Sequence, residues 1–109
     1  MAATYKVLGQ VNPAATTATT AYTVPSATET VISTITVANL GGFPTTYRIA
    51  VRPNGETLAN KHYIVYDSNV GPQTTDTLTL GITLDATDVV TVYSSSATMA
   101  FNLFGSEIA

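Results

Sequence analysis

Apolar and polar residues alternate with a period of two along most of this chain, and helical periodicity is almost absent. The alternation is clearest at residues 77–84, where every second residue is Leu or Ile and the residues between are Thr or Gly. Residues 47–51 and 99–103 repeat it. Because every second side chain of a strand lies on the same face, this pattern predicts an all-β protein. We expect Leu80 and Ile82, in the clearest strand, to lie in the core.

Clusters of Gly, Pro, Asn, Asp and Ser divide the chain at short intervals and predict turns between the strands. The Thr- and Ala-rich residues 14–21 are read as a short loop running into an edge strand, and residues 56–60 are compatible with one helical turn. The predicted strands lie at about 4–11, 18–24, 29–39, 45–52, 61–67, 76–84, 88–94 and 98–105.

Eight short strands in a chain of 109 residues fit a single domain covering residues 1–109. Such strands hide their apolar faces either by packing two sheets together or by closing a barrel. We favour a two-sheet antiparallel β-sandwich, jelly-roll-like or immunoglobulin-like in outline. The paired cysteines and the tyrosine corner of true immunoglobulin domains are not evident in the sequence. The composition agrees with an all-β fold, because 21 residues are Thr, a β-branched residue that favours strands.

The charge content narrows the classes of function. Only 10% of residues are charged, against about 25% in an average soluble domain, and the net charge is −3. An acidic chain with no Cys is neither a basic nucleic-acid binder, a disulfide scaffold nor a thiolate zinc protein, and anionic membrane surfaces repel it. A subunit that buries much of its exterior in an assembly tolerates such low charge.

The beginning of the sequence resembles no targeting segment. A charged stretch followed by an apolar run, as in a secretory signal, is not seen there, and no apolar stretch approaches the roughly 18 residues that span a bilayer. The lack of Cys fits synthesis in a reducing cytosol. We therefore expect a protein with neither a nucleic-acid nor a membrane partner.

Candidate catalytic chemistry is sparse. His62 is the only histidine, and no Gly-x-Ser-x-Gly pattern supplies a nucleophile for it. Beside Lys61 and Tyr63 it is read as a surface residue or a hydrogen-bonded residue at the edge of the core. Phosphate-binding glycine motifs are also missing. We expect no enzymatic activity and assign no catalytic or cofactor-binding residue.

Four aspartates, Asp67, Asp76, Asp85 and Asp88, fall in loops or at strand ends, where carboxylates can gather around Ca²⁺. The alternative is that they cap backbone N–H groups in tight turns, as Asp often does. We favour capping and assign no metal ligand.

The aromatic residues offer a second candidate site. Six Tyr and three Phe could form a carbohydrate platform, but nearly every Tyr falls inside a predicted strand, where packing in the core or at a sheet edge is the ordinary role. These tyrosines are Tyr5, Tyr22, Tyr47, Tyr63, Tyr66 and Tyr93.

Several segments, spread over nearly the whole chain, together resemble a family of small virion structural proteins of tailed bacteriophages, especially those that infect cyanobacteria and other aquatic bacteria. The segments are Tyr5–Gln10, Tyr22–Pro25, Val37–Asn39, Tyr47–Pro53, Leu58–Asp67, Leu78–Leu84 and Phe101–Glu107. They are packing and turn motifs, so the resemblance assigns no site residue.

The resemblance implies a capsid decoration (cement) protein that binds and stabilises the shell. Its partner would be the major capsid protein, and it would associate with itself as a trimer or, as the next alternative, a dimer. It would be made in the host cytoplasm and reside on the capsid surface of the virion. The alternative is a tail, baseplate or fibre component that binds a glycan or receptor.

Overall fold

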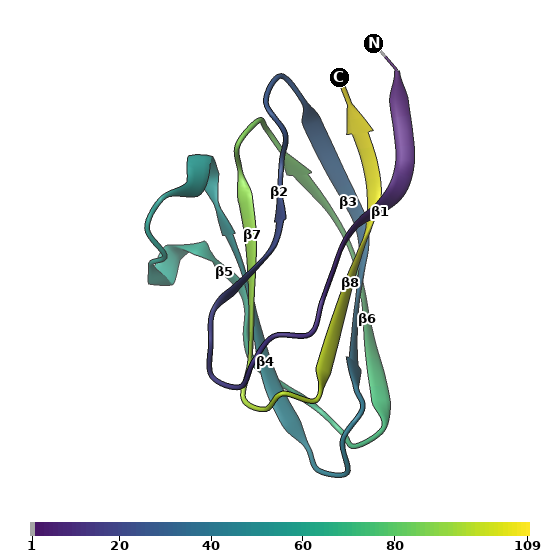
Figure 1. Cartoon of the computed structure of the whole chain (residues 1–109), viewed down its shortest axis with the longest axis vertical. Coiled ribbons are helices and arrows are strands. Elements are labelled where there is room, and N and C mark those ends of the chain that lie inside the picture. The colour runs from purple at the N-terminus through teal and green to yellow at the C-terminus, as the bar shows by residue number, and fades with distance from the viewer. Residues whose placement is uncertain (1) are drawn as a thin grey trace.

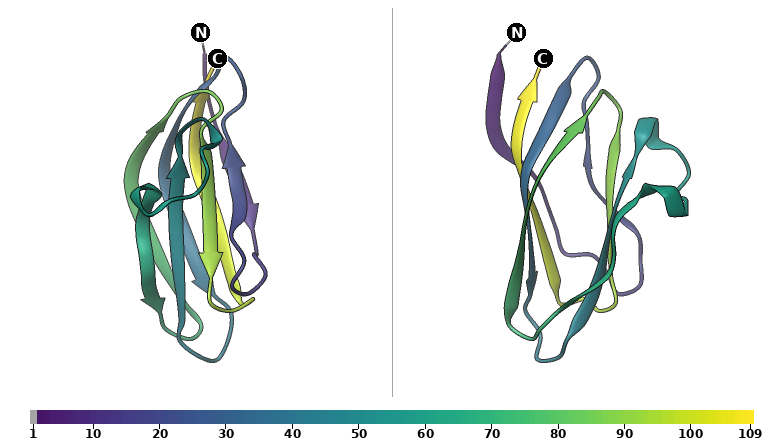
Figure 2. Two further views of the ribbon diagram at one scale, coloured as in Figure 1. Left: turned by 90° about the vertical axis from the view of Figure 1, so that its left-hand side faces the viewer. Right: turned by 180° about the vertical axis from the view of Figure 1, so that it is seen from behind.

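The computed structural model describes residues 2–109, which form eight strands arranged as two four-stranded sheets face to face (Figures 1 and 2). The strands are β1 (Ala3–Val11), β2 (Thr19–Thr23), β3 (Glu29–Asn39), β4 (Thr45–Arg52), β5 (Tyr63–Val70), β6 (Thr74–Leu84), β7 (Val89–Ser94) and β8 (Met99–Ile108).

The strand order identifies the sandwich as a jelly roll. Sheet A has the order β1-β8-β3-β6, and sheet B has the order β2-β7-β4-β5. All neighbouring strands are antiparallel. Among residues 2–109, the connection between β4 and β5 is the only one that stays within a sheet. Every other connection crosses to the opposite sheet. Two interleaved four-stranded sheets of this kind define the jelly roll. The predicted sandwich is therefore confirmed, and the immunoglobulin-like outline is not the one adopted.

The predicted strands match the observed ones to within a few residues. The Thr- and Ala-rich segment does lead into β2, which forms an edge of sheet B. The possible helical turn at 56–60 is absent from the described chain. Instead, two short 3₁₀ turns, Pro53–Gly55 and Asn60–His62, flank this segment.

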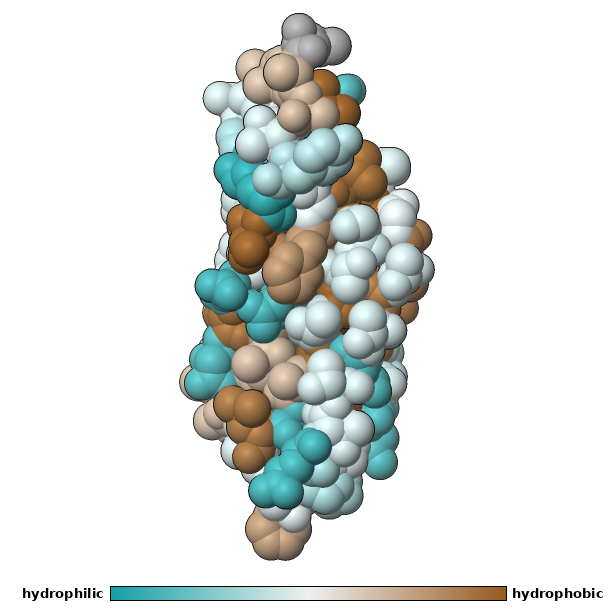
Figure 3. Space-filling model, turned by 90° about the vertical axis from the view of Figure 1, so that its right-hand side faces the viewer, coloured by the Kyte–Doolittle hydropathy of each residue, from teal (hydrophilic) through white to brown (hydrophobic). Residues whose placement is uncertain are grey.

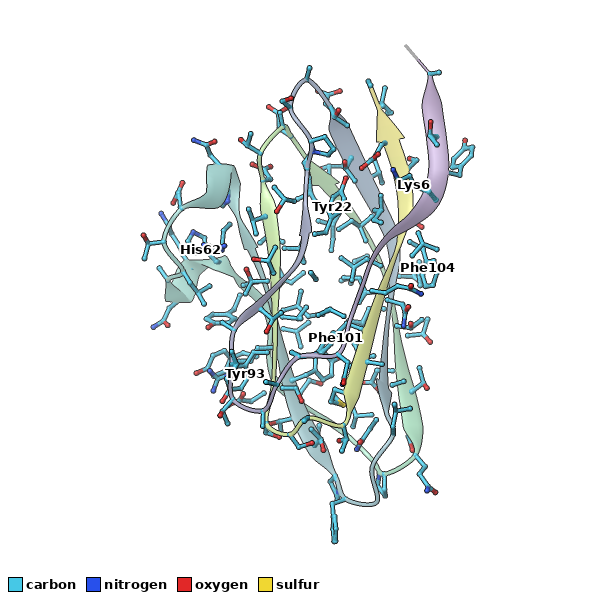
Figure 4. The ribbon with its side chains drawn as sticks, viewed as in Figure 1. Lys6, Tyr22, His62, Tyr93, Phe101 and Phe104 are labelled. Carbon is cyan, nitrogen blue, oxygen red and sulfur yellow. The ribbon has the colours of Figure 1, made fainter. Side chains whose placement is uncertain are left out.

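The core lies between the sheets and is made of inward-facing aliphatic and aromatic side chains. Phe101 of sheet A lies between the sheets (Figure 4). Tyr47 of sheet B packs edge-to-face on it, with ring centroids 5.9 Å apart. Such a pair is stabilised beyond the burial of its area. The other fully buried large side chains are Val24, Ile32, Ile35, Val37, Ile49, Val70, Val90, Val92, Met99 and Leu103.

A line of β-bulges crosses sheet A at the level of Phe104 and Gly105 of β8. In β1, Val7 pairs with Phe104 and Gly9 with Leu103, so that Leu8 is an extra residue. Strand β3 has an extra residue at the same level, Ser33. A bulge adds one residue to a strand and shifts the inward and outward positions that follow.

The same line of bulges reaches β6 and changes which of its residues are buried. Leu80 and Gly81 together lie opposite Ser33, and Gly81 has a φ of +64°, a conformation that glycine adopts without a Cβ penalty. Leu80 is therefore 49% exposed, and the prediction that it lies in the core is wrong. Ile82 does pack against the core.

Strand β3 shows the same effect. Alternation in the sequence places Val31 on one face with Ile35 and Val37, but Ile32 is the residue that faces the core. Val31 instead lies on the outer face, beside Ser106 of β8. Because Ser33 is an extra residue, even-numbered residues such as Ile32 face the core before the bulge, and odd-numbered residues such as Ile35 face the core after it.

At the far end of the sandwich, the buried amide of Asn39 joins three loops. Its Nδ2 donates to the carbonyl oxygens of Phe43 (2.8 Å) and Val70 (3.2 Å). Its Oδ1 accepts from the backbone N–H of Gly41 and the hydroxyl of Thr98, both at 3.0 Å. A buried polar group is stable only when it is hydrogen-bonded in this way. Asn39 therefore fixes the turns that follow β3 and β5.

Two leucines provide a test of the bulge line. We expect Leu103→Ala, which removes a fully buried side chain, to lower the free energy of unfolding by about 2–5 kcal/mol. Leu80→Ala should change it by less than about 0.5 kcal/mol, the usual size of a surface effect. Urea denaturation of both variants measures the difference. A loss of more than about 2 kcal/mol for Leu80→Ala would contradict the bulged register.

Candidate functional site

The aspartates of the β6–β7 turn cap backbone groups. Asp88 accepts from the backbone N–H groups of Asn54 (2.9 Å) and Asp85 (2.8 Å), one on each carboxylate oxygen. Asp85 accepts from the N–H of Ala86 at 2.7 Å. The capping interpretation is therefore confirmed for this pair.

The two other candidate aspartates lie elsewhere and have different partners. Asp67 forms an ion pair with Arg48, with Nε and Oδ1 2.6 Å apart, and Asp76 accepts from the Tyr47 hydroxyl at 3.2 Å. The four predicted candidates thus do not converge. Within residues 2–109, no group of three or more His, Cys, Asp or Glu side chains is placed to hold a metal ion.

His62 is a structural residue at the edge of the core. Its side chain is 3% exposed, and Nδ1 accepts from the backbone N–H of Ala59 at 3.0 Å, which closes the second 3₁₀ turn. Its Nε2 lies 3.5 Å from Glu56 Oε1, without a hydrogen bond in the described chain. Lys61, 3.4 Å from the same oxygen, is the main cause of the lowered pKa of Glu56. The reading of His62 as a hydrogen-bonded residue at the core edge is confirmed.

A polar bridge joins the two sheets at the end of the sandwich where the termini lie (Figures 1 and 4). The hydroxyl of Tyr22, from sheet B, donates to Glu107 Oε2 of sheet A and lies 2.8 Å from the hydroxyl of Thr30. The other oxygen of Glu107 pairs with Lys6 Nζ of β1 at 2.8 Å. We call Lys6, Tyr22, Thr30 and Glu107 the Tyr22 bridge.

The electrostatics of the Tyr22 bridge follow from its geometry. The hydrogen bond from Lys6, followed by that from Tyr22, lowers the pKa of Glu107, because both stabilise the carboxylate. Burial, followed by the hydrogen bond to Glu107, raises the pKa of Tyr22 to about 12. Glu107 is therefore charged and Tyr22 neutral at pH 7, and the Lys6–Glu107 ion pair adds a side-chain contact to the backbone pairing of β1 with β8.

One candidate surface is an apolar groove on the outer face of sheet A, which we call the sheet A groove. It has a volume of about 520 Å³ and lies over the outward side of β1, β8 and β3. Tyr5 at its rim is 84% exposed, and Phe104 points away from the core (Figure 4). On this face, separate apolar side chains lie among weakly polar and hydrophilic ones (Figure 3). The lining residues are Tyr5, Lys6, Val7, Val31, Ser33, Phe104, Gly105 and Ser106.

The sheet A groove borders the edge of the sheet. In the described chain, β1 pairs with β8 on one side only, so its other side presents backbone hydrogen-bonding groups. Charged side chains often protect such an edge, and the charged side chain in the middle of β1, Lys6, is paired with Glu107 in the Tyr22 bridge. The edge and the groove together form one surface that another polypeptide can extend and cover.

The second candidate surface is an aromatic cluster on the outer face of sheet B, made of Arg48, Tyr63, Tyr66 and Tyr93. The Arg48 guanidinium carbon lies 4.2 Å from the ring centroid of Tyr66 and 4.3 Å from that of Tyr93. Tyr63 packs edge-to-face against Tyr66, with centroids 4.9 Å apart. We call these four residues the Arg48 cluster.

Asp67 fixes the centre of the Arg48 cluster. It occupies a bulge of β5 with a φ of +51°, and its two oxygens accept from Arg48 Nε (2.6 Å) and NH2 (3.3 Å). This pairing is the main cause of the raised pKa of Arg48 and of the lowered pKa of Asp67. A two-point pair restricts the guanidinium plane, so the stacked rings are held in one arrangement.

The sequence identified the tyrosines as candidates but missed Arg48. Tyr22 and Tyr47 pack in the core as expected, whereas Tyr5 and Tyr66 are exposed. The sequence does contain one sign of the role of Arg48: it stands between two apolar residues of β4 that face the core, so its own side chain must face outward. The adjacency of β4, β5 and β7, which brings it to the tyrosines, is set only by the fold.

Comparisons with models of known protein families, with curated proteins and with solved structures gave no match to this chain. The residues that the structure describes include no helix long and apolar enough to cross a membrane.

The lowered pKa of Glu107 predicts a dependence of stability on pH. A carboxyl whose folded pKa is depressed contributes stability above its unfolded pKa, about 4.3, and loses it as pH falls through the folded pKa. We expect the wild type to exceed Glu107→Gln in free energy of unfolding by a constant amount between about pH 6 and 8, and by less as pH falls below about 4.5. Urea denaturation across this range measures the difference. A difference that stays unchanged down to about pH 3 would contradict the bridge.

Proposed function

We propose that this protein is a virion structural protein of a tailed bacteriophage, and specifically a capsid decoration protein that binds the major capsid protein and stabilises the shell. The observation that carries the proposal is the sheet A groove beside the unpaired edge of β1. The sequence resemblance to small phage structural proteins supplies the biological context.

The chemistry of this surface suits a protein partner. Tyr5, Val7 and Phe104 offer apolar area with little charge, and the β1 edge offers main-chain donors and acceptors. An extended segment of a capsid subunit can add to β1 as a further strand while its alternate side chains enter the groove. Main-chain hydrogen bonds then contribute affinity, and the pockets contribute specificity.

The fold is compatible with this role but does not establish it. Jelly rolls form the domains of many viral capsid proteins and also of lectins, so the argument from fold is one of analogy. A protein made in the cytosol and acting outside the cell gains from a fold that needs no disulfide. This chain contains no Cys.

The proposed mechanism of stabilisation is mass action. A ligand that binds only the assembled shell lowers the free energy of that state and slows its opening. Self-association as a trimer, or as a dimer, would raise the effective concentration of neighbouring binding sites on a symmetric shell. No catalytic step is part of this proposal.

A specific observation favours a second candidate, a tail, baseplate or fibre component. The Arg48 cluster is an exposed, ordered aromatic surface on the face opposite the sheet A groove. Receptor-binding modules use surfaces of this kind, and Tyr and Arg are common at binding hot spots. Particles that lack the protein distinguish the two roles: loss of genome retention on heating supports the capsid, and loss of adsorption to host cells with normal retention supports the tail.

A pair of exposed aromatic residues tests the docking surface. Tyr5→Ala should weaken binding of the purified protein to empty shells that lack it by about tenfold or more, because it removes an exposed anchor at the rim of the groove. Phe43→Ala is the matched control, since Phe43 is 81% exposed but lies in the loop before β4, away from the groove. Co-sedimentation with shells measures both affinities.

The proposal fails if the wild-type protein does not bind the shells. The assignment to the sheet A groove fails if Tyr5→Ala and Phe43→Ala bind with equal affinity. Both side chains are exposed, so neither variant should alter the stability of the fold by more than about 0.5 kcal/mol.

A further inference from the structure

The outer face of sheet B carries a pocket that the capsid-binding proposal does not use. Its volume is about 440 Å³, within the range of small-molecule sites, and it is lined by Asn60, Tyr63 and Tyr66. We propose that this pocket binds a neutral carbohydrate, in the form of a short stretch of pyranose rings. The inference goes beyond capsid binding, and it gives a ligand class to the Arg48 cluster, the surface on which the second candidate function rests.

The two tyrosines form a corner. Their rings are inclined at 81° to each other, with centroids 4.9 Å apart. A pyranose has an apolar side of C–H groups and a rim of hydroxyl groups. In the proposed complex, the exposed part of the Tyr66 ring packs against the C–H groups, and a phenol hydroxyl bonds to the rim.

The corner is ordered before a ligand arrives. Tyr66 is 57% exposed, yet Arg48 lies 4.2 Å from its ring centroid and is itself held at two points by Asp67. The guanidinium carbon of Arg48 also lies 4.3 Å from the ring centroid of Tyr93. A ring that is already fixed loses little conformational entropy on binding, which favours affinity in a shallow site.

The pocket also has a polar wall. Asn60 begins the 3₁₀ turn Asn60–His62, and the buried imidazole of His62 fixes this turn through the N–H of Ala59. A carboxamide both donates and accepts, as do sugar hydroxyls, so Asn60 can bond neighbouring hydroxyl groups of one ring. Aromatic lining with a few placed polar groups is typical of ligand pockets.

The charges around the pocket favour a neutral ligand. Arg48 is paired with Asp67, and Lys61 with Glu56, whereas Arg52 donates to the hydroxyl of Thr91 and the carbonyl oxygen of Glu56, so each of these cations already has a hydrogen-bonding or ionic partner. A phosphate, sialate or uronate would need a cation that lacks such a partner. A proline-rich peptide is the main competing ligand, because aromatic grooves also bind that conformation.

The test is a titration of the full-length, isotope-labelled protein followed by amide NMR shifts. The probes are cellohexaose, maltohexaose and mannohexaose as neutral sugars, hexagalacturonate as an acidic sugar, and a decaproline peptide. We expect at least one neutral sugar to bind saturably with a Kd below about 10 mM, with shifts confined to β4, β5, β7 and the 3₁₀ turn. Hexagalacturonate should bind more weakly.

Variants assign the binding to the pocket. Tyr66→Ala and Asn60→Ala should each raise the Kd at least about fivefold, since each removes one wall of the site. Phe43→Ala is the matched control, because it removes an exposed aromatic side chain from the loop before β4, outside the residues that line the pocket, and should leave the Kd unchanged. Both Tyr66 and Asn60 are exposed, and equal urea midpoints would verify that the variants are folded.

Three outcomes would overturn the inference: no neutral sugar binding below about 10 mM, binding unaffected by Tyr66→Ala, or binding of decaproline alone. None of them bears on the shell-binding experiment, which probes the other face of the sandwich. The carbohydrate site and the capsid contact can therefore fail independently.

Discussion

The close approach of β3 to Gly105 determines the form of sheet A. A Cβ on Gly105 would lie 2.0 Å from the carbonyl oxygen of Val31, so only glycine allows β3 to pass this point. The bulges of β1, β3 and β6 lie at this level. Because they change the parity of the strands, Val31 and Leu80 face outward, whereas Ile32 and Ile82 face the core. The sheet A groove depends on that change.

Two tyrosine–carboxylate contacts then join the sheets near opposite ends of the core. Tyr22 donates to Glu107 on one side of the core, and Tyr47 donates to Asp76 on the other. In both cases, the tyrosine comes from sheet B, the carboxylate comes from sheet A, and burial is the first cause of the raised pKa of the tyrosine. The polar bonds satisfy hydroxyl groups that an apolar interior would otherwise leave unpaired. The candidate binding surfaces, in contrast, lie on the outer faces of the two sheets.

Sequence alone was sufficient for the strands, since alternation and turn residues are local signals. It failed for Leu80 because the bulge depends on the pairing of β6 with β3 and of β3 with β8, and a strand taken by itself shows unbroken alternation. The Arg48 cluster could not be predicted from the sequence either, because Arg48 and Tyr93 meet only through the pairing of β4 with β7. The aspartates were interpreted correctly as caps where the partner is close in sequence, as in the Asp85–Asp88 turn. The partners of Asp67 and Asp76 come from β4 and were not predicted.

The most direct test of the proposed role is a cryo-electron microscopy map of the virion at a resolution that shows strands. If the protein is a capsid decoration protein, we expect many symmetric copies on the capsid surface, each with the sheet A groove and the β1 edge against the major capsid protein and with the Arg48 cluster facing solvent. Density for this protein only in the tail, or copies on the capsid with sheet A facing solvent, would contradict this expectation.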